Sequence, residues 1–129
     1  MRIKLTSIMV DDQANAERFY TEVLGFRKKL DFPLGDYRWL TVVSPDGPDD
    51  LELVLEPNAN PAGEAYQQAM FSRGIPIAMF ESRDIDAEFA RLSALGVQFI
   101  QTPVALGAVK IAVFADTCGN FIQMYQPAA

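Results

Sequence analysis

The stretch "VDDQANAERFYTEVLGF" (residues 10–26) decides the fold, because a shorter echo of it, "SRDIDAEFARLSALGV" (82–97), returns later in the chain. In each copy an aspartate, Asp12 or Asp84, precedes apolar residues at helical spacing, and a Leu-Gly pair closes the run. Aspartate caps the first turn of a helix, and glycine readily adopts the left-handed conformation that ends one. The two stretches therefore predict equivalent helices in two repeated modules.

Alternating apolar and polar residues flank the first of these helices. Residues 2–10 alternate before it; after it come a strand from Phe26, the segment "RWLTVVS" (38–44) and the segment "LELVLEP" (51–57). Period-two alternation bounded by Pro- and Gly-rich turns is typical of strands. The first module therefore has the predicted order strand, helix, three strands.

The end of the chain repeats the end of this module, since "SPDGPDDLELVLEP" (44–57) is echoed by "FADTCGNFIQMYQP" (114–127). Each has an Asp-containing turn, an alternating strand and a final proline. We therefore predict a single domain of residues 1–129, made of module one (about 1–57), a linker (58–76) with a short helix around 65–71, and module two (about 77–127).

A module with one helix over four strands leaves the other face of its sheet bare, so it must pack on or pair with a second module. We expect an α+β fold in which two βαβββ modules form a curved, barrel-like mixed sheet with the helices on the outer face. The concave side is then the natural place for a pocket.

Composition excludes several classes of protein. Half of the 129 residues are apolar, which is ample for one core, and a single cysteine forms no intramolecular disulfide. No apolar run approaches the roughly 20 residues that span a membrane, and the N-terminus reaches carboxylates too early for a signal peptide. We expect a cytoplasmic protein. The net charge of -6, interrupted only by "RKK" at 27–29, argues against a nucleic-acid partner.

Three segments in this order, "VDDQANAERFYTEVLGF", the second Asp-helix-Leu-Gly pattern and "DTCGNFIQMYQP" (116–127), resemble the glyoxalase, bleomycin-resistance and extradiol-dioxygenase superfamily, also called vicinal oxygen chelate proteins. The resemblance covers essentially the whole chain. It implies paired βαβββ modules, commonly assembled as homodimers, whose concave sheet holds either a divalent metal or an organic ligand.

The resemblance also implies positions for metal ligands, which fall near Leu5, Glu52, Ile77 and Gln123. Leucine and isoleucine have no donor atoms, and the chain contains no histidine to replace them. A hard cation such as Mg²⁺ would find only one carboxylate among the four positions. We therefore expect no metal and no other cofactor.

Five residues are candidates for binding a small organic ligand, and each has a structural alternative. Trp39 is an aromatic platform or a core or dimer-interface residue, and Arg38 is a clamp for an anion or a surface guanidinium. Gln123 is a hydrogen-bonding amide or a solvated one, since alternation places it on a face with Phe121 and Tyr125. The remaining two candidates are Glu52, which either binds ligand or faces water, and Met79, which either lines the pocket or packs in the core.

Three functions follow from these residues. The first is a metal-independent small-molecule binding protein, which is supported by the resemblance together with the apolar residues at two of the ligand positions. The second is a glyoxalase-like lyase or isomerase with Glu52 as general base, and the third is a protein-interaction module. Metal content separates the second from the first, and a small molecule bound after purification argues against the third.

Overall fold

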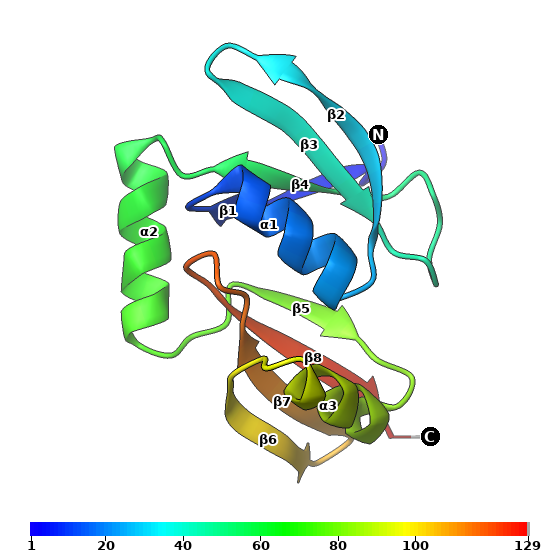
Figure 1. Ribbon diagram of the computed structural model, residues 1–129. Coiled ribbons are helices and arrows are strands. Elements are labelled where there is room, and N and C mark those ends of the chain that lie inside the picture. Colours follow the sequence, from blue (N-terminus) through cyan, green and yellow to red (C-terminus); the bar gives the residue numbers. More distant parts are fainter. Residues whose placement is uncertain (129) are drawn as a thin grey trace. The chain divides into compact units, whose positions relative to one another are not determined.

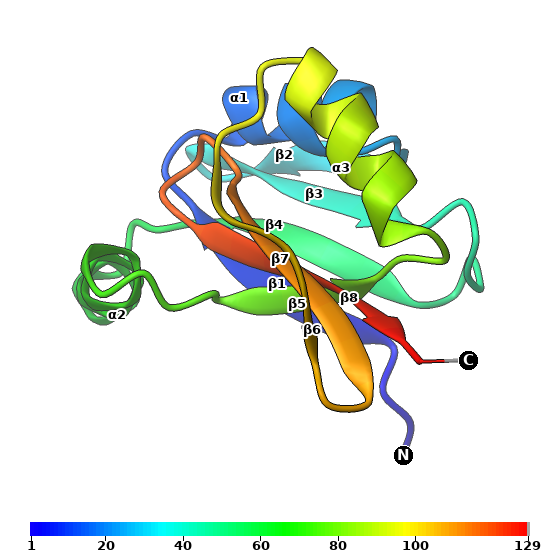
Figure 2. The ribbon, with the colours of Figure 1, turned by 90° about the horizontal axis from the view of Figure 1, so that it is seen from below.

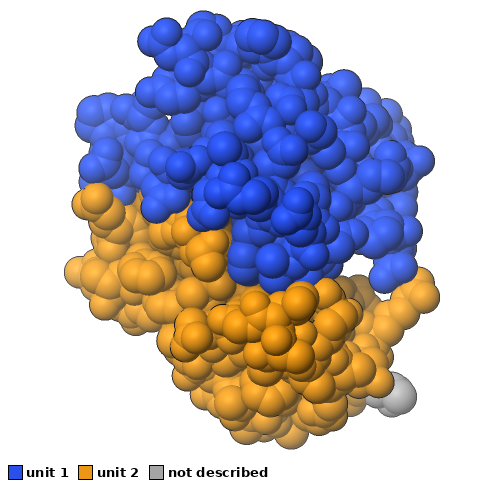
Figure 3. All heavy atoms as spheres, in the orientation of Figure 1, with its two compact units in different colours: residues 1–66 blue, residues 67–129 orange. Residues whose placement is uncertain are grey.

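The computed structural model describes residues 1–128 and divides into two compact units: unit 1, residues 1–66, and unit 2, from Gln67 onward (Figure 3). Each unit contains one four-stranded mixed sheet, and neither sheet closes on itself. The α+β fold of two βαβββ modules is therefore confirmed. None of the helices in residues 1–128 is long and apolar enough to cross a membrane.

Unit 1 has the strand order β1-β4-β3-β2 (Figure 1). β1 runs parallel to β4, and the other neighbours are antiparallel. Its elements are β1 (Leu5–Val10), α1 (Gln13–Arg18), a π-helical turn η1 (Phe19–Val23), β2 (Arg27–Leu34), β3 (Tyr37–Val43) and β4 (Glu52–Pro57).

Unit 2 repeats this topology with the order β5-β8-β7-β6, in which only β5 and β8 are parallel. Its elements are β5 (Ala78–Glu81), α3 (Ile85–Ala94), β6 (Phe99–Leu106), β7 (Val109–Ala115) and β8 (Phe121–Pro127). The boundary between the units falls inside α2 (Pro61–Ser72), a helix longer than the short one expected for the linker.

Both helix signals read from the sequence are confirmed. The side chains of Asp12 and Asp84 each accept a hydrogen bond, at 3.0 Å, from the backbone N–H three residues later. Gly25 and Gly96 follow the helices with φ of 88° and 87°, values that glycine tolerates and L side chains resist. Local sequence therefore sets where the two helices begin and end.

Each helix covers one face of the sheet in its own unit: α1 packs on β3 and β4, and α3 packs on β6, β7 and β8 (Figure 2). Alternate strand residues are buried beneath the helices, and each large apolar side chain buried in this way contributes about 1.5–3 kcal/mol. These strand residues are Ile8, Val10, Leu40, Val42 and Leu55 in unit 1, and Ala112, Phe114, Ile122 and Met124 in unit 2.

The two sheets differ where the third and fourth strands of each module meet. In unit 2 all seven residues of β7 pair with β8, from Val109–Pro127 to Ala115–Phe121. In unit 1 only two pairs join β3 to β4, Thr41–Val54 and Val42–Leu53. The sheet of unit 1 therefore opens between β3 and β4 on one side of these pairs.

Candidate functional site

The opening in unit 1 coincides with a pocket of about 470 Å³, a volume within the usual range for small-molecule sites. Strand alternation places most of its side chains on the sheet face opposite α1, since the intervening residues Ile8, Leu40 and Leu55 are buried under the helix. The lining residues are Leu5, Thr6, Ser7, Leu34, Tyr37, Arg38, Trp39, Val54, Glu56, Pro57 and Asn60.

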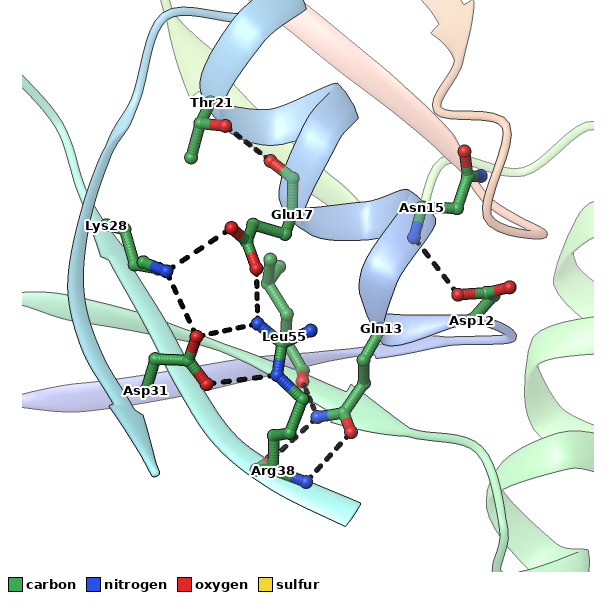
Figure 4. Close-up of polar contacts among 9 residues, drawn as sticks. All are labelled: Asp12, Gln13, Asn15, Glu17, Thr21, Lys28, Asp31, Arg38 and Leu55. Carbon is green, nitrogen blue, oxygen red and sulfur yellow. Dashed lines mark hydrogen bonds and ion pairs between the residues drawn. The ribbon is translucent and has the colours of Figure 1, made fainter. Parts of the chain in front are cut away.

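Gln13, the first residue of α1, holds the strands where their ladder ends (Figure 4). Its side-chain amide donates to the backbone oxygens of Arg38, at 2.7 Å, and Leu55, at 2.9 Å. Its side-chain oxygen accepts from the Arg38 backbone N–H at 3.0 Å. One side chain thus satisfies three backbone groups that the separated strands leave without ladder partners, and burial of such groups unpaired is costly.

The guanidinium of Arg38 points to the α1 side of the sheet, where it meets two carboxylates (Figure 4). Its Nε and Nη2 donate to Asp31 at 3.0 and 2.7 Å, and Nη2 also donates to Glu17. Lys28 Nζ contacts both carboxylates, at 3.0 Å to Asp31 and 3.3 Å to Glu17. These four residues, which we call the Arg38 cluster, have no net formal charge.

Hydrogen bonding shifts the pKa of every group in the Arg38 cluster toward its charged form. Donation by Arg38, and then by Lys28, holds the pKa of Asp31 well below its ordinary range, and the pKa of Glu17 is lowered mainly by Arg38. Acceptance by Asp31, and then by Glu17, raises the pKa of Arg38 and of Lys28. The cation of Arg38 is therefore occupied within the protein, which argues against a clamp for an anionic ligand, one of the two alternatives considered for this residue.

Strand alternation directs the side chains of Thr6 and Arg38 toward α1, so the polar side chains of the pocket come from the other polar lining residues, Ser7, Tyr37, Glu56 and Asn60. Asn60 Oδ1 accepts from the Ala62 N–H at 2.9 Å, which leaves its amide N–H groups for other partners. Glu56 is half-buried, and its carboxylate has no hydrogen bond or ion pair with any residue of the described chain. The pocket thus combines apolar walls with one uncompensated negative charge.

Glu52 has a different environment from Glu56, although both lie on β4. The Glu52 side chain is buried and accepts a hydrogen bond from Thr41 Oγ1 at 2.8 Å. Lys29 Nζ lies 3.9 Å from the carboxylate, and Thr41 Oγ1 also accepts from the Leu30 N–H at 3.1 Å, beside a β-bulge. Glu52 is outside the set of pocket-lining residues, and its contacts join β2, β3 and β4 of the sheet.

Met79 and Gln123 lie in unit 2, on neighbouring strands and in direct register. Gln123 Nε2 is 3.4 Å from Met79 Sδ, and the Met79 side chain is 63% exposed. Ile122 and Met124, on either side of Gln123, are buried under α3, so Gln123 faces away from the helix. The face predicted for Gln123 from strand alternation is therefore correct.

Strand register tests whether the residues present fit a metal. Aligning the capping residues Asp12 and Asp84 makes Ser7 equivalent to Met79, and their register partners Val54 and Gln123 are then equivalent too. With this alignment the counterpart of Glu52 is Phe121, two residues before Gln123 on the same strand.

Leu5 and Glu52 are register partners, but by this alignment a leucine, an isoleucine and a phenylalanine occupy three of the four equivalent positions. Within residues 1–128, no three His, Cys, Asp or Glu side chains are grouped closely enough to hold a metal ion. The donor set therefore does not fit a divalent cation.

Of the five residues chosen from the sequence, Trp39 and Arg38 border the pocket, Met79 and Gln123 meet in unit 2, and Glu52 is buried in the sheet of unit 1. Sequence reasoning missed Glu56, although it shares the alternating β4 face with Glu52 and Val54. It also missed Gln13, because a polar residue after a helix cap looks like ordinary solvent-exposed sequence.

Comparisons with known proteins identify the family of the chain and similar folds. A family model described as the Glyoxalase/Bleomycin resistance protein/Dioxygenase superfamily matches residues 2–124. The chain is 54% identical over 126 residues to the uncharacterized protein YurT of Bacillus subtilis (strain 168), which covers 98% of this chain and 99% of that protein.

Two similar solved structures cover nearly the whole chain. UcmS2 has a TM-score of 0.83 and 32% identity, covering 97% of both chains. TnmS3, an antibiotic binding protein from Streptomyces sp. CB03234, has a TM-score of 0.77 and 30% identity, covering 98% of this chain and 96% of its own. Because the family model spans almost all of the sequence, the chain belongs to the glyoxalase, bleomycin resistance protein and dioxygenase superfamily.

Proposed function

We propose that the protein binds a small organic molecule without the help of a metal, and that the pocket of unit 1 forms a principal part of the site. The observation that carries this proposal is the pocket itself: about 470 Å³, lined by two aromatic and several aliphatic side chains, with a few polar groups among them. Such a composition is usual for sites that bury an apolar ligand and orient it by a small number of polar contacts.

Two comparisons support small-molecule binding. The superfamily includes bleomycin resistance proteins by description, and the similar structure TnmS3 is described as an antibiotic binding protein. The absence of donor atoms at Leu5, Ile77 and Phe121 supports binding without a metal, since a single buried carboxylate that already accepts from Thr41 is a poor site for a cation. We propose separately that Met79 and Gln123 contact a ligand on the face of the unit 2 sheet opposite α3.

A glyoxalase-like lyase or isomerase has less support. Its general base would be Glu52, which must come within about 3 Å of a substrate proton. The Glu52 carboxylate is instead buried against Thr41, with Lys29 nearby, and it does not border the pocket. We therefore assign Glu52 a structural role.

We also propose a homodimer. Large apolar side chains remain exposed on β2 and β3 of unit 1, including Phe32 at 46%, Leu34 at 56% and Tyr37 at 48%. Contiguous exposed apolar surface commonly marks an interaction site. Light scattering at micromolar concentration tests this proposal, and a mass near 14.3 kDa would contradict it.

The binding proposal is tested with N-phenyl-1-naphthylamine, an uncharged aromatic dye whose emission rises in apolar surroundings. Trp39 is the only tryptophan of the chain and borders the pocket, so quenching of its fluorescence reports occupation of this site. We expect saturable binding in the micromolar range that is the same before and after dialysis against a chelator.

The variant Ser7→Phe places a ring in the pocket and should abolish this binding. The matched control is Ser93→Phe, which adds the same ring at an exposed serine on α3. Equal affinity of Ser7→Phe and the wild type, or loss of binding after chelator treatment, would overturn the proposal.

A further inference from the structure

The Glu56 carboxylate is the one feature of the pocket that the proposed function leaves unexplained. It is half-buried among the lining residues Val54, Tyr37 and Trp39, and no residue of the described chain neutralises it. Withdrawing a carboxylate from water without a partner costs free energy. An unpaired carboxylate in a mostly apolar pocket is therefore a group whose partner is expected to come from outside the chain.

The cationic residue among those that line the pocket, Arg38, is not available to Glu56. The guanidinium is held on the α1 side of the sheet by Asp31 and Glu17, and the Arg38 backbone both donates to and accepts from the Gln13 side chain. The Arg38 cluster is internally neutral, so it does not offset the charge of Glu56. The pocket consequently presents a net negative charge, in a chain whose net charge is already -6.

The aromatic residues of the pocket, like its negative charge, favour a cationic ligand. Tyr37 and Trp39 border the same pocket, and the faces of such rings attract a cation when it lies within about 6 Å. A ligand with a protonated amine beside an aromatic or aliphatic body would satisfy the carboxylate, the rings and the apolar walls together. An anionic ligand would meet repulsion from Glu56.

Resting on the proposed function, we infer that the pocket of unit 1 selects ligands that carry a protonated amine, or a similar hydrogen-bond-donating cation, on an apolar or aromatic body. Glu56 is the specificity-determining residue of this pocket. It accepts hydrogen bonds from the cation, while Tyr37 and Trp39 contact the charge and the adjoining apolar atoms. Charge-assisted hydrogen bonds of this kind are stronger than neutral ones.

The test uses three naphthalene compounds of similar size as competitors of N-phenyl-1-naphthylamine: 1-naphthylmethylamine, a cation; 1-naphthylmethanol, which is neutral; and 1-naphthoate, an anion. We expect the wild type to bind the cation about tenfold more tightly than the neutral compound, and the anion more weakly than either. This preference should decline as the salt concentration rises.

The variant Glu56→Gln keeps the size of the side chain and removes its charge, so the cation should lose its advantage over the neutral compound. Glu81→Gln removes an exposed carboxylate from β5 of unit 2 and should retain the wild-type ranking. Equal displacement by all three compounds, or a preference that survives Glu56→Gln, would overturn the inference while the dye still bound. If the dye itself failed to bind the wild type, the proposed function would fall, and the inference with it.

Discussion

The two units share a topology but differ at the first residue of their helices. In unit 1 this residue is Gln13, whose amide reaches between β3 and β4 to bond Arg38 and Leu55. In unit 2 it is Ile85, which is fully buried, and its backbone N–H donates to the Gln126 side chain at 2.8 Å. A polar residue at the helix start thus accompanies an open sheet, and an apolar one accompanies a continuous sheet.

The turns before the last strands also differ: polar contacts are buried in the turn of unit 2, and the turn of unit 1 is exposed. In unit 1 residues 44–51 are exposed. In unit 2 Asp116 accepts from the N–H groups of Cys118 and Asn120, and the Gln67 amide donates to Cys118 O and Asn120 Oδ1, all in a buried network. The two units therefore use polar contacts differently. In unit 2 buried hydrogen bonds fix the turn before the last strand, whereas in unit 1 the contacts of Gln13 hold β3 and β4 apart beside the pocket.

The largest expected effect breaks the rigid turn of unit 2. Gly119 has φ of 94°, and a Cβ built there would lie 2.9 Å from Gln67 Nε2. We expect Gly119→Ala to lower the free energy of unfolding by about 3 kcal/mol, because backbone strain adds to the loss of buried hydrogen bonds. Denaturant unfolding provides the measurement.

Gly107→Ala is the matched control, since Gly107 has φ of 59° and open space around its Cβ position. It should cost about 1 kcal/mol through backbone strain alone. Equal losses in the two variants would show that the contact between Gln67 and the turn contributes little.

The second prediction breaks the link that holds unit 1 open. Gln13→Leu should lower the free energy of unfolding by about 2 kcal/mol, since it leaves backbone groups of Arg38 and Leu55 without partners. The Arg38 amide should also exchange its hydrogen faster, and affinity for N-phenyl-1-naphthylamine should fall. Exchange protection at Arg38 equal to that of the wild type would contradict this role.

Gln98→Leu serves as the comparison, because Gln98 is an exposed glutamine of unit 2 whose side-chain amide makes a long hydrogen bond of 3.4 Å to Gly96 O. We expect it to change the free energy of unfolding by less than about 0.5 kcal/mol and to leave dye binding intact.

The third prediction concerns how the stability contributed by the Arg38 cluster depends on pH. The pKa values of Asp31 and Glu17 are depressed in the folded protein, so their stabilisation is fully present above the ordinary carboxyl range and is lost as the pH falls through the folded-state values. Arg38→Leu should lower the free energy of unfolding by about 1 kcal/mol at pH 7, discounted for partial exposure. The difference from the wild type should be constant above about pH 5 and shrink below about pH 4.

Unfolding measured at a series of pH values checks this expectation. Arg91→Leu removes an exposed pair with Glu88 on α3 and should cost only a few tenths of a kcal/mol at pH 7. A difference between Arg38→Leu and the wild type that grew on acidification would contradict the assigned direction of the pKa shifts.

The smallest expected effect on stability is that of Gln123→Ala in unit 2. The amide contacts only a thioether sulfur, a weak acceptor, so the free energy of unfolding should change by less than about 0.5 kcal/mol. Any ligand held at this face of unit 2 should bind about fivefold more weakly, as for one lost hydrogen bond. Unchanged affinity would show that this face of unit 2 takes no part in binding.

Local sequence determined the modules. The capping residues Asp12 and Asp84, the closing Leu-Gly pairs and the alternating strands act over a few residues, so the repeat, the helix boundaries and the face of Gln123 could be predicted from the chain alone. The sequence also predicted that Leu5 cannot bind a metal, since the leucine side chain lacks donor atoms in any fold.

Tertiary structure alone decided the site. Whether Arg38 is free or neutralised depends on Asp31 and Glu17, which reach it from a neighbouring strand and from α1. Strand alternation places Glu52 and Glu56 on the same face of β4, yet of these two carboxylates it is Glu52 that accepts a hydrogen bond from Thr41 of β3. The chemistry of a polar side chain is set by groups distant in the chain, and alternation along one strand carries no information about them.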